Sequence, residues 1–170
     1  MSLRIREATS ADLTALADLH VRTWNATYPE VEKKPTLAIR VRQWREAFAV
    51  TDRNWCCFVV EREDGALVGF AKGVPYHHQE LPEFSGELSK IYLLRAYQRQ
   101  GLGRRLVGHV ARRFLSRGIG SMVLFADPAN PSCRFYEALG AERLYDSAGN
   151  FHGGYGWRDL HRLAALCPID

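Results

Sequence analysis

The sequence predicts a single α/β domain, of the α+β type, over residues 1–170, and three observations support this prediction. The chain of 170 residues is long enough to enclose one hydrophobic core, and 46% of its residues are hydrophobic. Helical and strand periodicities follow one another along the chain, which is typical of mixed folds. No repeat, low-complexity tract or linker divides it.

The first half of the chain predicts a strand, two helices and three further strands, two of them forming a hairpin. Residues 3–8 alternate apolar and charged side chains, which is typical of a half-buried strand. Thr9 or Ser10 can cap the first helix, and 24–35 is expected to be a loop. Asp64-Gly65 is a strong signal for the turn of the hairpin. We place the second helix over 37–48 and the strands over 56–61, 66–74 and 87–94.

The second half predicts two helices and three strands. A helix is expected over 101–116, where apolar residues recur at every fourth position. Asn130 is placed at the N-cap of a short helix, with Pro131 at its first position and Gly140 after its end. The remaining strands are expected over 121–126, 141–146 and 151–160.

The excess of positive charge lies in one segment. The chain carries 23 Lys and Arg against 19 Asp and Glu, a formal net charge of +4. The segment Leu88–Ala126 holds Lys90 and seven arginines and no acidic residue. Such a segment attracts an anion, either a nucleic acid or the phosphates of a cofactor. A solvated helix face is the third interpretation, and composition does not choose among them.

Several other classes of protein are disfavoured. No apolar run approaches the roughly 20 residues of a membrane span, and the N-terminus lacks the apolar core of a signal peptide, so we expect a cytoplasmic protein. No metal site is expected, because the adjacent His77 and His78 have no third ligand spaced nearby. Cysteine spacing favours reduced, mostly buried thiols. These cysteines are Cys56, Cys57, Cys133 and Cys167.

The stretch from Gln98 to Arg105 joins an expected strand to an expected helix and can bind a phosphate. A helix N-terminus offers free backbone N–H groups and the positive end of the helix dipole. Glycines at 101 and 103 allow an anion to approach the backbone closely. The P-loop pattern is absent, and the dinucleotide-binding pattern fails at its third glycine, where Leu106 stands.

The stretch Gln98–Gly103 (QRQGLG) resembles the Q/R-x-x-G-x-G/A motif of the GNAT family of N-acetyltransferases. Residues 130–142 (NPSCRFYEALGAE) resemble that family's second signature, and the order of elements is similar from residue 3 to about residue 160. The resemblance implies the GNAT fold, a mixed, mostly antiparallel sheet of six to seven strands with about four helices. In that fold the fourth and fifth strands splay apart, and acetyl-CoA, the co-substrate of an acyltransferase, lies between them.

The resemblance also assigns roles to single residues. Backbone amides of the motif would hold the pyrophosphate, while main-chain groups of Tyr92 and Leu93 would pair with the pantetheine arm as an added strand does. Asn130 would contact the same arm. One or two arginines are expected near the 3′-phosphate and the rest in solvent. The cofactor-binding set is Tyr92, Leu93, Gln98, Arg99, Gln100, Gly101, Leu102, Gly103, Arg104, Asn130 and Tyr136.

Two side chains are the catalytic candidates. Transfer to an amine requires a base for the amine proton and an acid for the departing thiolate. Glu87 opens the strand that leads to the cofactor and resembles a glutamate common at that position, so we predict that it is the base. Tyr136 is predicted to be the acid, because a phenol of pKa about 10 can protonate a thiolate. The alternatives are a solvated carboxylate and a packed aromatic.

In the GNAT fold the acceptor enters opposite the cofactor, here past the loop 24–35 and the segment 146–157. The aromatic and acidic side chains of these segments would suit a cationic amine, and they would equally suit a plug at the edge of the core. We expect a small-molecule or peptide amine as the partner, with a homodimer allowed and neither membrane nor nucleic acid involved. A non-catalytic acyl-CoA sensor and a nucleic-acid-binding module are the alternative functions. The substrate-binding candidates are Trp24, Tyr28, Glu30 and Tyr155.

Overall fold

The computed structural model describes residues 2–52 and 54–170 and contains a seven-stranded sheet, which confirms the α/β prediction. The strand order is β1-β2-β3-β4-β5-β7-β6. Neighbouring strands are antiparallel except β4 and β5, which run parallel. The strands are β1 (Leu3–Glu7), β2 (Cys56–Arg62), β3 (Leu67–Pro75), β4 (Gly86–Leu93), β5 (Met122–Phe125), β6 (Glu142–Tyr145) and β7 (Phe151–Trp157).

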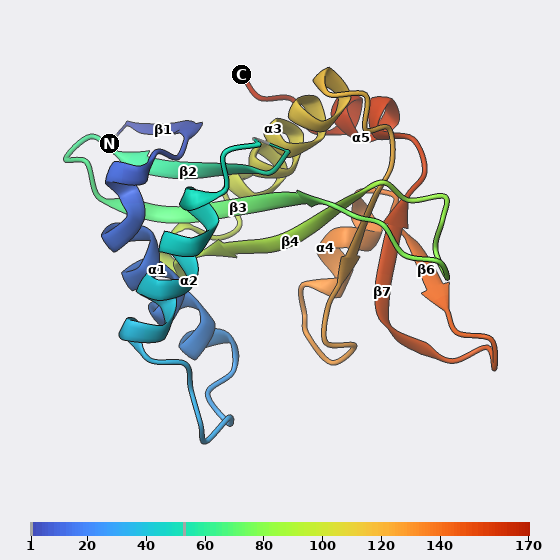
Figure 1. Cartoon of the computed structure of the whole chain (residues 1–170), viewed down its shortest axis with the longest axis horizontal. Helices are drawn as coiled ribbons and strands as arrows, with labels where there is room; N and C mark the ends of the chain where they lie inside the picture. Colours follow the sequence, from blue (N-terminus) through green and yellow to red (C-terminus); the bar gives the residue numbers. More distant parts are fainter. Residues whose placement is uncertain (1, 53) are drawn as a thin grey trace.

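Helices cover both faces of the sheet (Figure 1). Helix α1 packs on α2 and on strands β3 and β4, whereas α3 packs on β2, β3, β4 and α5. The helices are α1 (Leu13–Thr27), α2 (Leu37–Ala49), α3 (Leu102–Ser116), α4 (Cys133–Ala138) and α5 (Leu160–Leu166), with short 3-10 turns η1 (Ser10–Asp12) and η2 (Arg95–Tyr97).

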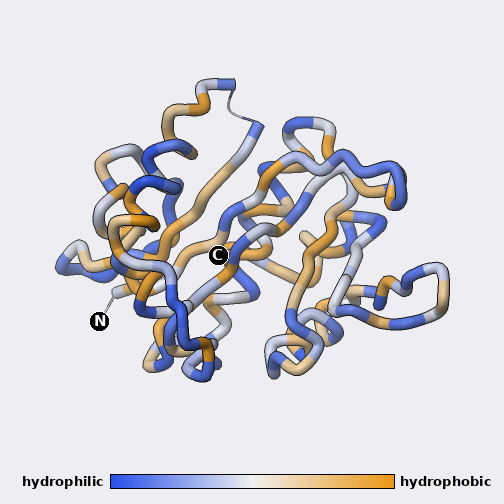
Figure 2. The backbone as a smooth tube through the Cα atoms, turned by 60° about the horizontal axis from the view of Figure 1, so that its bottom comes forward, coloured by the Kyte–Doolittle hydropathy of each residue, from blue (hydrophilic) through white to orange (hydrophobic). Residues whose placement is uncertain are grey.

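The two-residue period of β2 explains why there are two cores, one on each face. Cys56, Phe58 and Val60 belong to the core beneath α3, while the intervening Cys57 and Val59 belong to the core beneath α1 and α2. Burying both faces of a strand requires a continuous apolar run, and β2 supplies one. Along the helices hydrophobic and hydrophilic residues alternate, as Figure 2 shows, because each helix buries one side only.

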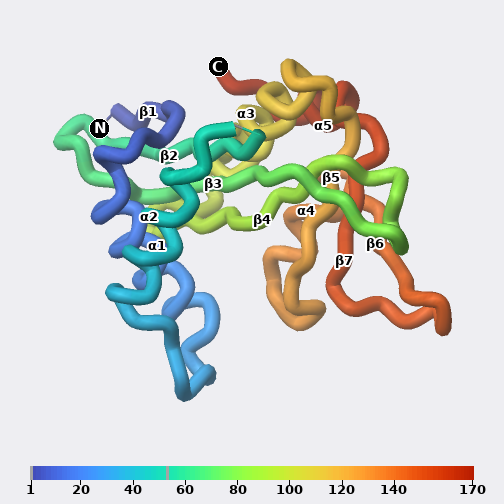
Figure 3. Tube along the Cα trace, in the orientation of Figure 1, coloured from blue at the N-terminus to red at the C-terminus, as the bar shows by residue number. Residues whose placement is uncertain are grey.

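Strands β4 and β5 separate almost as soon as they meet. Their pairing is confined to Gly86 with Met122 and Glu87 with Val123, after which β4 continues to Leu93 without a strand on that edge. Figure 3 shows β4 leaning away from β5 and β7 along the rest of its length. The sheet therefore has two parts, one formed by β1–β4 and one by β5–β7. They separate near the start of β4.

Helix α1 is longer than the sequence predicts. The expected loop begins at Trp24, but the helix continues to Thr27, whose hydroxyl donates to the Thr23 carbonyl oxygen at 2.8 Å. It ends there because a residue that precedes a proline disfavours helical backbone, and Tyr28 precedes Pro29. In α2, Trp44 is buried, whereas Leu37 at the start of the helix is exposed.

Two further differences lie in the second half. Helix α4 begins at Cys133, with Ser132 at its N-cap, because the Asn130 side chain instead closes the preceding turn by accepting the Ser132 N–H at 2.9 Å. The expected last strand ends at Trp157, and α5 follows it. The Asp159 side chain caps α5 by accepting the His161 N–H at 2.9 Å. A helix of seven residues has too short a pattern to stand out from the strand before it.

The four cysteines are buried and free, in agreement with the prediction of reduced thiols. In residues 2–52 and 54–170 no helix is long and apolar enough to cross a membrane. The same residues contain no group of three or more His, Cys, Asp and Glu side chains placed to hold a metal ion.

Gly108 allows α3 and α5 to approach each other closely. A Cβ atom added to Gly108 would clash with the Cys167 carbonyl oxygen and would lie 3.1 Å from the Cys167 Cβ. Arg112 strengthens the same contact, since its guanidinium donates to the Cys167 and Ala164 carbonyl oxygens at 2.7 and 2.9 Å. The glycine weakens the helix locally but permits this contact, which explains its place in the middle of α3.

We expect Gly108→Ala to lower the free energy of unfolding by about 1–2 kcal/mol, because overpacking at a close contact outweighs the roughly 1 kcal/mol gained in helix propensity. Urea denaturation followed by circular dichroism measures the difference. Gly120→Ala is the matched control, since no atom lies within 4 Å of an added Cβ there. A more stable Gly108→Ala protein would contradict the packing explanation.

Candidate active site

The turn before α3 has the geometry of an anion-binding concavity. Gly101 is left-handed, with φ of 81°, and Arg99 also has a positive φ, 64°, which no other non-glycine residue in the described chain has. Left-handed residues alternating with others point successive N–H groups into one hollow. Gly101 is the N-cap of α3 and no side chain caps that helix, so its first amides have no partner within the helix. An anion can supply that partner.

The side chains around this turn divide into two groups. Gln98 donates to the Leu93 carbonyl oxygen and Gln100 to the Ala96 carbonyl oxygen, each at 3.0 Å, so both amides hold the turn in shape. Arg99 and Arg104 are exposed beside the hollow. An added Cβ on Gly101 would meet no atom within 4 Å, whereas one on Gly103 would lie 3.3 Å from Phe135. The open side of the turn is therefore at Gly101.

Half of the basic residues of segment 88–126 stabilise the fold, which corrects the expectation that the remaining arginines are solvated. Besides Arg112, Arg105 and Arg117 donate to the carbonyl oxygens of Ile169 and Trp55 at 3.3 and 3.0 Å. Arg113 forms a two-pronged ion pair with the Glu7 carboxylate at 2.6 and 2.8 Å. These contacts tie α3 and its C-terminus to distant parts of the chain and reduce the number of arginines that are free to bind a ligand.

A cavity of about 500 Å³, here called the α1–β4 cleft, opens next to this turn. Its walls are the last turns of α1, the end of β4 with η2, and the loop 127–132. The cleft brings together predicted residues of both kinds, for the co-substrate and for the acceptor. Those that line it are Tyr28, Glu30, Leu93, Gln98 and Asn130.

The unpaired edge of β4 faces the side from which β5 departs. The Leu94 N–H donates to the Val68 carbonyl oxygen of β3 at 2.9 Å. Because backbone groups of successive residues in a strand point to opposite sides, Ile91 and Leu93 direct theirs toward the open edge, and Tyr92 directs its own toward β3. The Tyr92 ring lies on the α1 side, 5.7 Å from the His20 ring centroid. Burial raises the pKa of the Tyr92 phenol to about 12.

Tyr136 and Tyr155 are neighbours in the core under α4, with ring centroids 5.9 Å apart. Tyr136 retains 6% of its accessible surface, and its burial raises the pKa of its phenol well above the usual value. Tyr155 retains none, and its hydroxyl donates to the Glu137 carboxylate at 2.8 Å. Neither tyrosine is among the residues that line the cleft, and only Tyr136 keeps some exposed surface.

Glu87 lies at the point where the sheet divides, in the last residue pair between β4 and β5. Its side chain is half-buried, and burial raises the pKa of the carboxyl group while the nearby Lys90 opposes that shift. A carboxylate with a raised pKa at a sheet opening has the character of a general base. The structure gives Glu87 no ion pair within 4 Å among the described residues.

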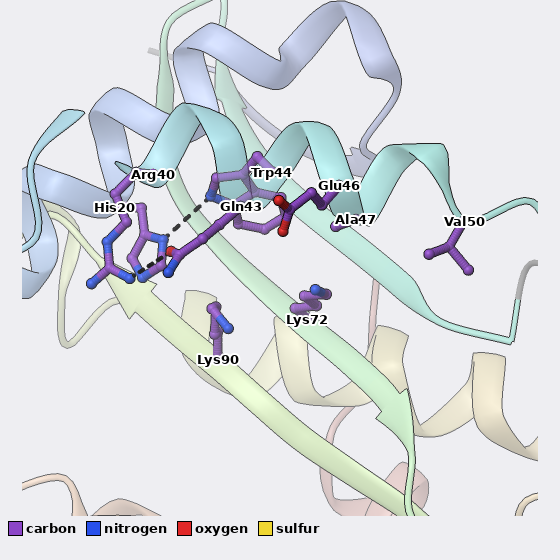
Figure 4. Close-up of a pocket in the computed structure, with 9 residues that line it drawn as sticks. All are labelled: His20, Arg40, Gln43, Trp44, Glu46, Ala47, Val50, Lys72 and Lys90. Carbon is purple, nitrogen blue, oxygen red and sulfur yellow. Dashed lines mark hydrogen bonds between the residues drawn. The ribbon is translucent and has the colours of Figure 1, made fainter. Parts of the chain in front are cut away.

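A second cavity, of about 440 Å³, lies between α2 and strands β3 and β4, and no sequence pattern indicates it (Figure 4). We call it the cationic pocket, because three basic side chains, Arg40, Lys72 and Lys90, line it from three elements. Lysines at 72 and 90 become neighbours only through strand register, which is invisible in sequence. The lining residues are His20, Arg40, Gln43, Trp44, Glu46, Ala47, Val50, Lys72 and Lys90.

His20 forms the buried wall of the cationic pocket. Its Nδ1 accepts the indole N–H of Trp44 at 3.3 Å, and its ring packs edge-on against Phe70 at 5.5 Å. Burial first, and then the charges of Arg40, Lys90 and Lys72, lower the pKa of His20 to about 3. The imidazole is therefore neutral at physiological pH.

Trp24 lies at the junction of the two cavities. Its ring centroid is 5.0 Å from that of Tyr28, which lines the cleft. Its face is covered by the guanidinium of Arg40, 5.7 Å from the ring centroid. The cation–π position that an amine substrate was expected to take on Trp24 is thus already held by a side chain of the protein.

Known proteins share features of this chain's sequence and fold. The model of the acetyltransferase (GNAT) family matches residues 13–141. An uncharacterised N-acetyltransferase, YuaI of Bacillus subtilis, is 32% identical over 169 residues, covering 95% of this chain and 96% of that protein. The PaiA N-acetyltransferase of Thermoplasma acidophilum, solved with coenzyme A, has a TM-score of 0.71 at 18% identity and covers 92% of this chain and 98% of its own. A phosphinothricin acetyltransferase of Sinorhizobium meliloti, solved with acetyl-CoA, has a TM-score of 0.67 at 21% identity and covers 92% and 86%.

The neutral state of His20 makes stability depend on pH. Its pKa is about 3 in the folded protein and about 6.5 in the unfolded chain, so its contribution is complete above pH 6.5 and is lost as the pH falls toward 3. We expect the free energy of unfolding in urea to fall by about 2 kcal/mol between pH 7 and pH 5 from this group.

His20→Gln, which keeps an acceptor for Trp44, should lose less than half as much stability over the same interval. His161→Gln, a change at an exposed histidine, is the control and should behave as the wild type does. Equal pH dependence in His20→Gln and the wild type would show that His20 is not held neutral.

Proposed function

The chain belongs to the acetyltransferase (GNAT) family, and we propose that it transfers the acetyl group of acetyl-CoA to a primary amine of a small molecule or peptide. The observation that supports this most strongly is the junction of three features in one place. The edge of β4 is unpaired beyond Glu87, the α1–β4 cleft opens beside it, and the left-handed turn at Arg99 and Gly101 lies at its end. A ligand with an extended arm and a terminal pyrophosphate fits that sequence of features.

Residues of this chain offer a partner for each part of acetyl-CoA. The amides of Gly101, Leu102, Gly103 and Arg104 would receive the pyrophosphate, helped by the exposed charges of Arg99 and Arg104. The backbone groups of Ile91 and the carbonyl oxygen of Leu93 would pair with the pantetheine arm, because these two residues point to the open edge. Asn130 lines the same cleft from the opposite wall. When bound, acetyl-CoA supplies an activated acyl group as a thioester.

The protein's own groups would then carry protons and stabilise charge. Glu87 would take a proton from the incoming ammonium, directly or through water, so that the neutral nitrogen can attack the carbonyl carbon. A nitrogen–carbon bond forms and the carbon–sulfur bond breaks, and the products are an amide and a thiol. The Leu93 N–H, which points to the open edge, would stabilise the negative charge that develops on the carbonyl oxygen.

Tyr136 would serve the departing thiolate. Its raised pKa keeps the phenol protonated at neutral pH, as a proton donor must be. The same shift makes complete proton transfer less favourable, so we infer that Tyr136 first stabilises the thiolate by donating a hydrogen bond. Among the earlier substrate candidates, Tyr28 and Glu30 remain at the acceptor entrance because they line the cleft, whereas Tyr155 is left out because it is fully buried.

We expect the wild-type protein to bind acetyl-CoA in a one-to-one complex of micromolar affinity, measured by isothermal titration calorimetry at two salt concentrations. Gly101→Ala should weaken that affinity at least tenfold, because a left-handed L-residue costs about 1–2 kcal/mol and the turn can relax only by changing shape. Gly65→Ala is the matched control, since Gly65 has φ of 84° and equally open surroundings in the β2–β3 hairpin. It should lose similar stability and bind acetyl-CoA normally.

Failure of acetyl-CoA to bind, with salt-sensitive binding of a short DNA duplex instead, would overturn the acetyltransferase proposal and favour the nucleic-acid alternative. Equal loss of affinity in Gly65→Ala and Gly101→Ala would remove the turn from the binding site.

Tyr136→Phe should reduce turnover at least tenfold, in an assay of thiol release with an amine that the wild type acetylates, while acetyl-CoA affinity changes less than threefold. Tyr145→Phe makes the same chemical change at an exposed residue of β6 and serves as the control. Unchanged turnover in Tyr136→Phe would exclude the acid role. Binding of acetyl-CoA without thiol release for any amine would favour the sensor alternative.

A further inference from the structure

We propose that the acceptor of this enzyme carries an anionic group, a carboxylate or a phosphate, in addition to its amine, and that Arg40, Lys72 and Lys90 bind that group in the cationic pocket. The inference rests on the proposed function, because it names the substrate class for the same site. It differs from the cationic amine that the aromatic and acidic loop residues predict.

The pocket concentrates positive charge in a way that the fold alone does not require. Lys72 of β3 and Lys90 of β4 are direct cross-strand partners on one face of the sheet, and like charges in that relation repel. Arg40 of α2 lines the same pocket from above (Figure 4). Burial lowers the pKa of Lys90, and the charges of Lys72 and Arg40 lower it further. Burial lowers the pKa values of Lys72 and Arg40 as well.

No direct ion pair within the described chain neutralises these charges, although Glu46 also lines the pocket and the Glu87 carboxylate favours the charged form of Lys90. Among residues 2–52 and 54–170 no carboxylate lies within 4 Å of a nitrogen of Arg40, Lys72 or Lys90. The Lys72 Nζ lies over the Trp44 and Trp55 rings, 5.4 and 5.3 Å from their centroids. These contacts hold the ammonium but leave its charge available.

Arg40 is the least exposed of the three, and one of its buried nitrogens is unsatisfied. It retains 8% of its accessible surface, and its Nε has no hydrogen-bond partner. One terminal nitrogen donates to the Gln43 side chain at 3.0 Å. A buried guanidinium without a counter-ion is unfavourable, and it becomes favourable when an anion with two oxygens meets its planar donors. His20 cannot serve as that anion, because it is neutral.

The position of the pocket matches the chemistry proposed for the site. Lys72 and Val74 lie two residues apart on one face of β3, and their partners on β4 are Lys90 and Glu87. Lys90 and Glu87 therefore share a face of the sheet. An acceptor whose anionic group lies between Arg40 and Lys90 would direct its amine along β4 toward Glu87 and the open edge. The pocket volume of about 440 Å³ suits a small metabolite.

The direct test measures anion binding on protein saturated with coenzyme A, so that the turn before α3 is already occupied. Inorganic phosphate and acetate are titrated separately and followed by NMR chemical shifts. We expect saturable binding of at least one anion to the wild type, weakened at least fivefold in Arg40→Gln and in Lys90→Gln. Arg42→Gln, an exposed change on the same helix, should bind as the wild type does. Equal binding in all four proteins, or none in the wild type, would overturn the inference.

A second arm uses turnover. Amines of the form H₂N–(CH₂)n–X, with X a methyl, carboxylate or phosphonate group, are compared at saturating acetyl-CoA. We expect at least a tenfold higher kcat/KM for one anionic series than for the methyl series, and loss of that preference in Lys90→Gln through KM. A preference for the carboxylate series or for the phosphonate series identifies the anionic group of the acceptor. A preference for the methyl series would contradict the proposal.

Misfolding of a variant and failure of the proposed function can both be distinguished from failure of the anion site. Lys90→Gln removes a like-charge pair, so it should melt at the wild-type temperature or up to about 3 °C above it. If coenzyme A does not bind, the proposed function fails, and the phosphate titration is repeated without it on the same variants. Dependence of phosphate binding on Arg40 and Lys90 would then still support the anion site.

Discussion

The structure depends on one interruption in backbone pairing, the separation of β4 from β5 after two residue pairs. Buried backbone N–H and C=O groups require partners, and an unpaired strand edge is a place where a ligand can supply them. The walls of the α1–β4 cleft are built on both sides of this interruption, by α1 and by the loop 127–132. Glu87 stands at the point of separation and the left-handed turn at the far end of the same edge. The co-substrate route and the proposed chemistry follow from that single break in the sheet.

The basic side chains of this protein fall into two groups with unrelated roles, and their hydrogen bonds and ion pairs distinguish the two groups. Arg105, Arg112, Arg113 and Arg117 donate to carbonyl oxygens or to Glu7 and stabilise the packing of α3. Arg40, Lys72 and Lys90 line one pocket and, among the described residues, form no ion pair within 4 Å with a carboxylate. Proteins keep locally unfavourable arrangements of this kind mainly at functional sites, where a ligand can relieve the repulsion. The arginines that account for the positive charge of segment 88–126 are therefore largely different from the three basic residues that support an anionic acceptor.

The two cavities are connected by a group of aromatic side chains. Trp24 contacts Tyr28 of the cleft on one side and Arg40 of the cationic pocket on the other. His20 lies against Tyr92 and accepts a hydrogen bond from Trp44. Because His20 stays neutral, this group packs without adding charge to an already cationic region. The two cavities are thus neighbours on the α1 and α2 side of the sheet, which is consistent with the proposal that the acceptor and the co-substrate reach β4 from different directions.

Local patterns in the sequence determined most of the secondary structure and the turn before α3. Seven strands and four of the five helices follow from residue spacing, apolar runs and the signals for caps and turns, and the glycines at 101 and 103 indicate an anion at a helix N-terminus. All these signals act over a few neighbouring residues. Helix α5 was missed because seven residues carry too little periodicity, and α1 ran past its expected end because Pro29, not Trp24, stops it. The fully buried position of Tyr155, the meeting of Lys72 with Lys90 and the contact of Arg40 with Trp24 were decided by tertiary structure alone. Strand register and helix packing bring together residues far apart in the chain, and no local pattern records which of them will meet.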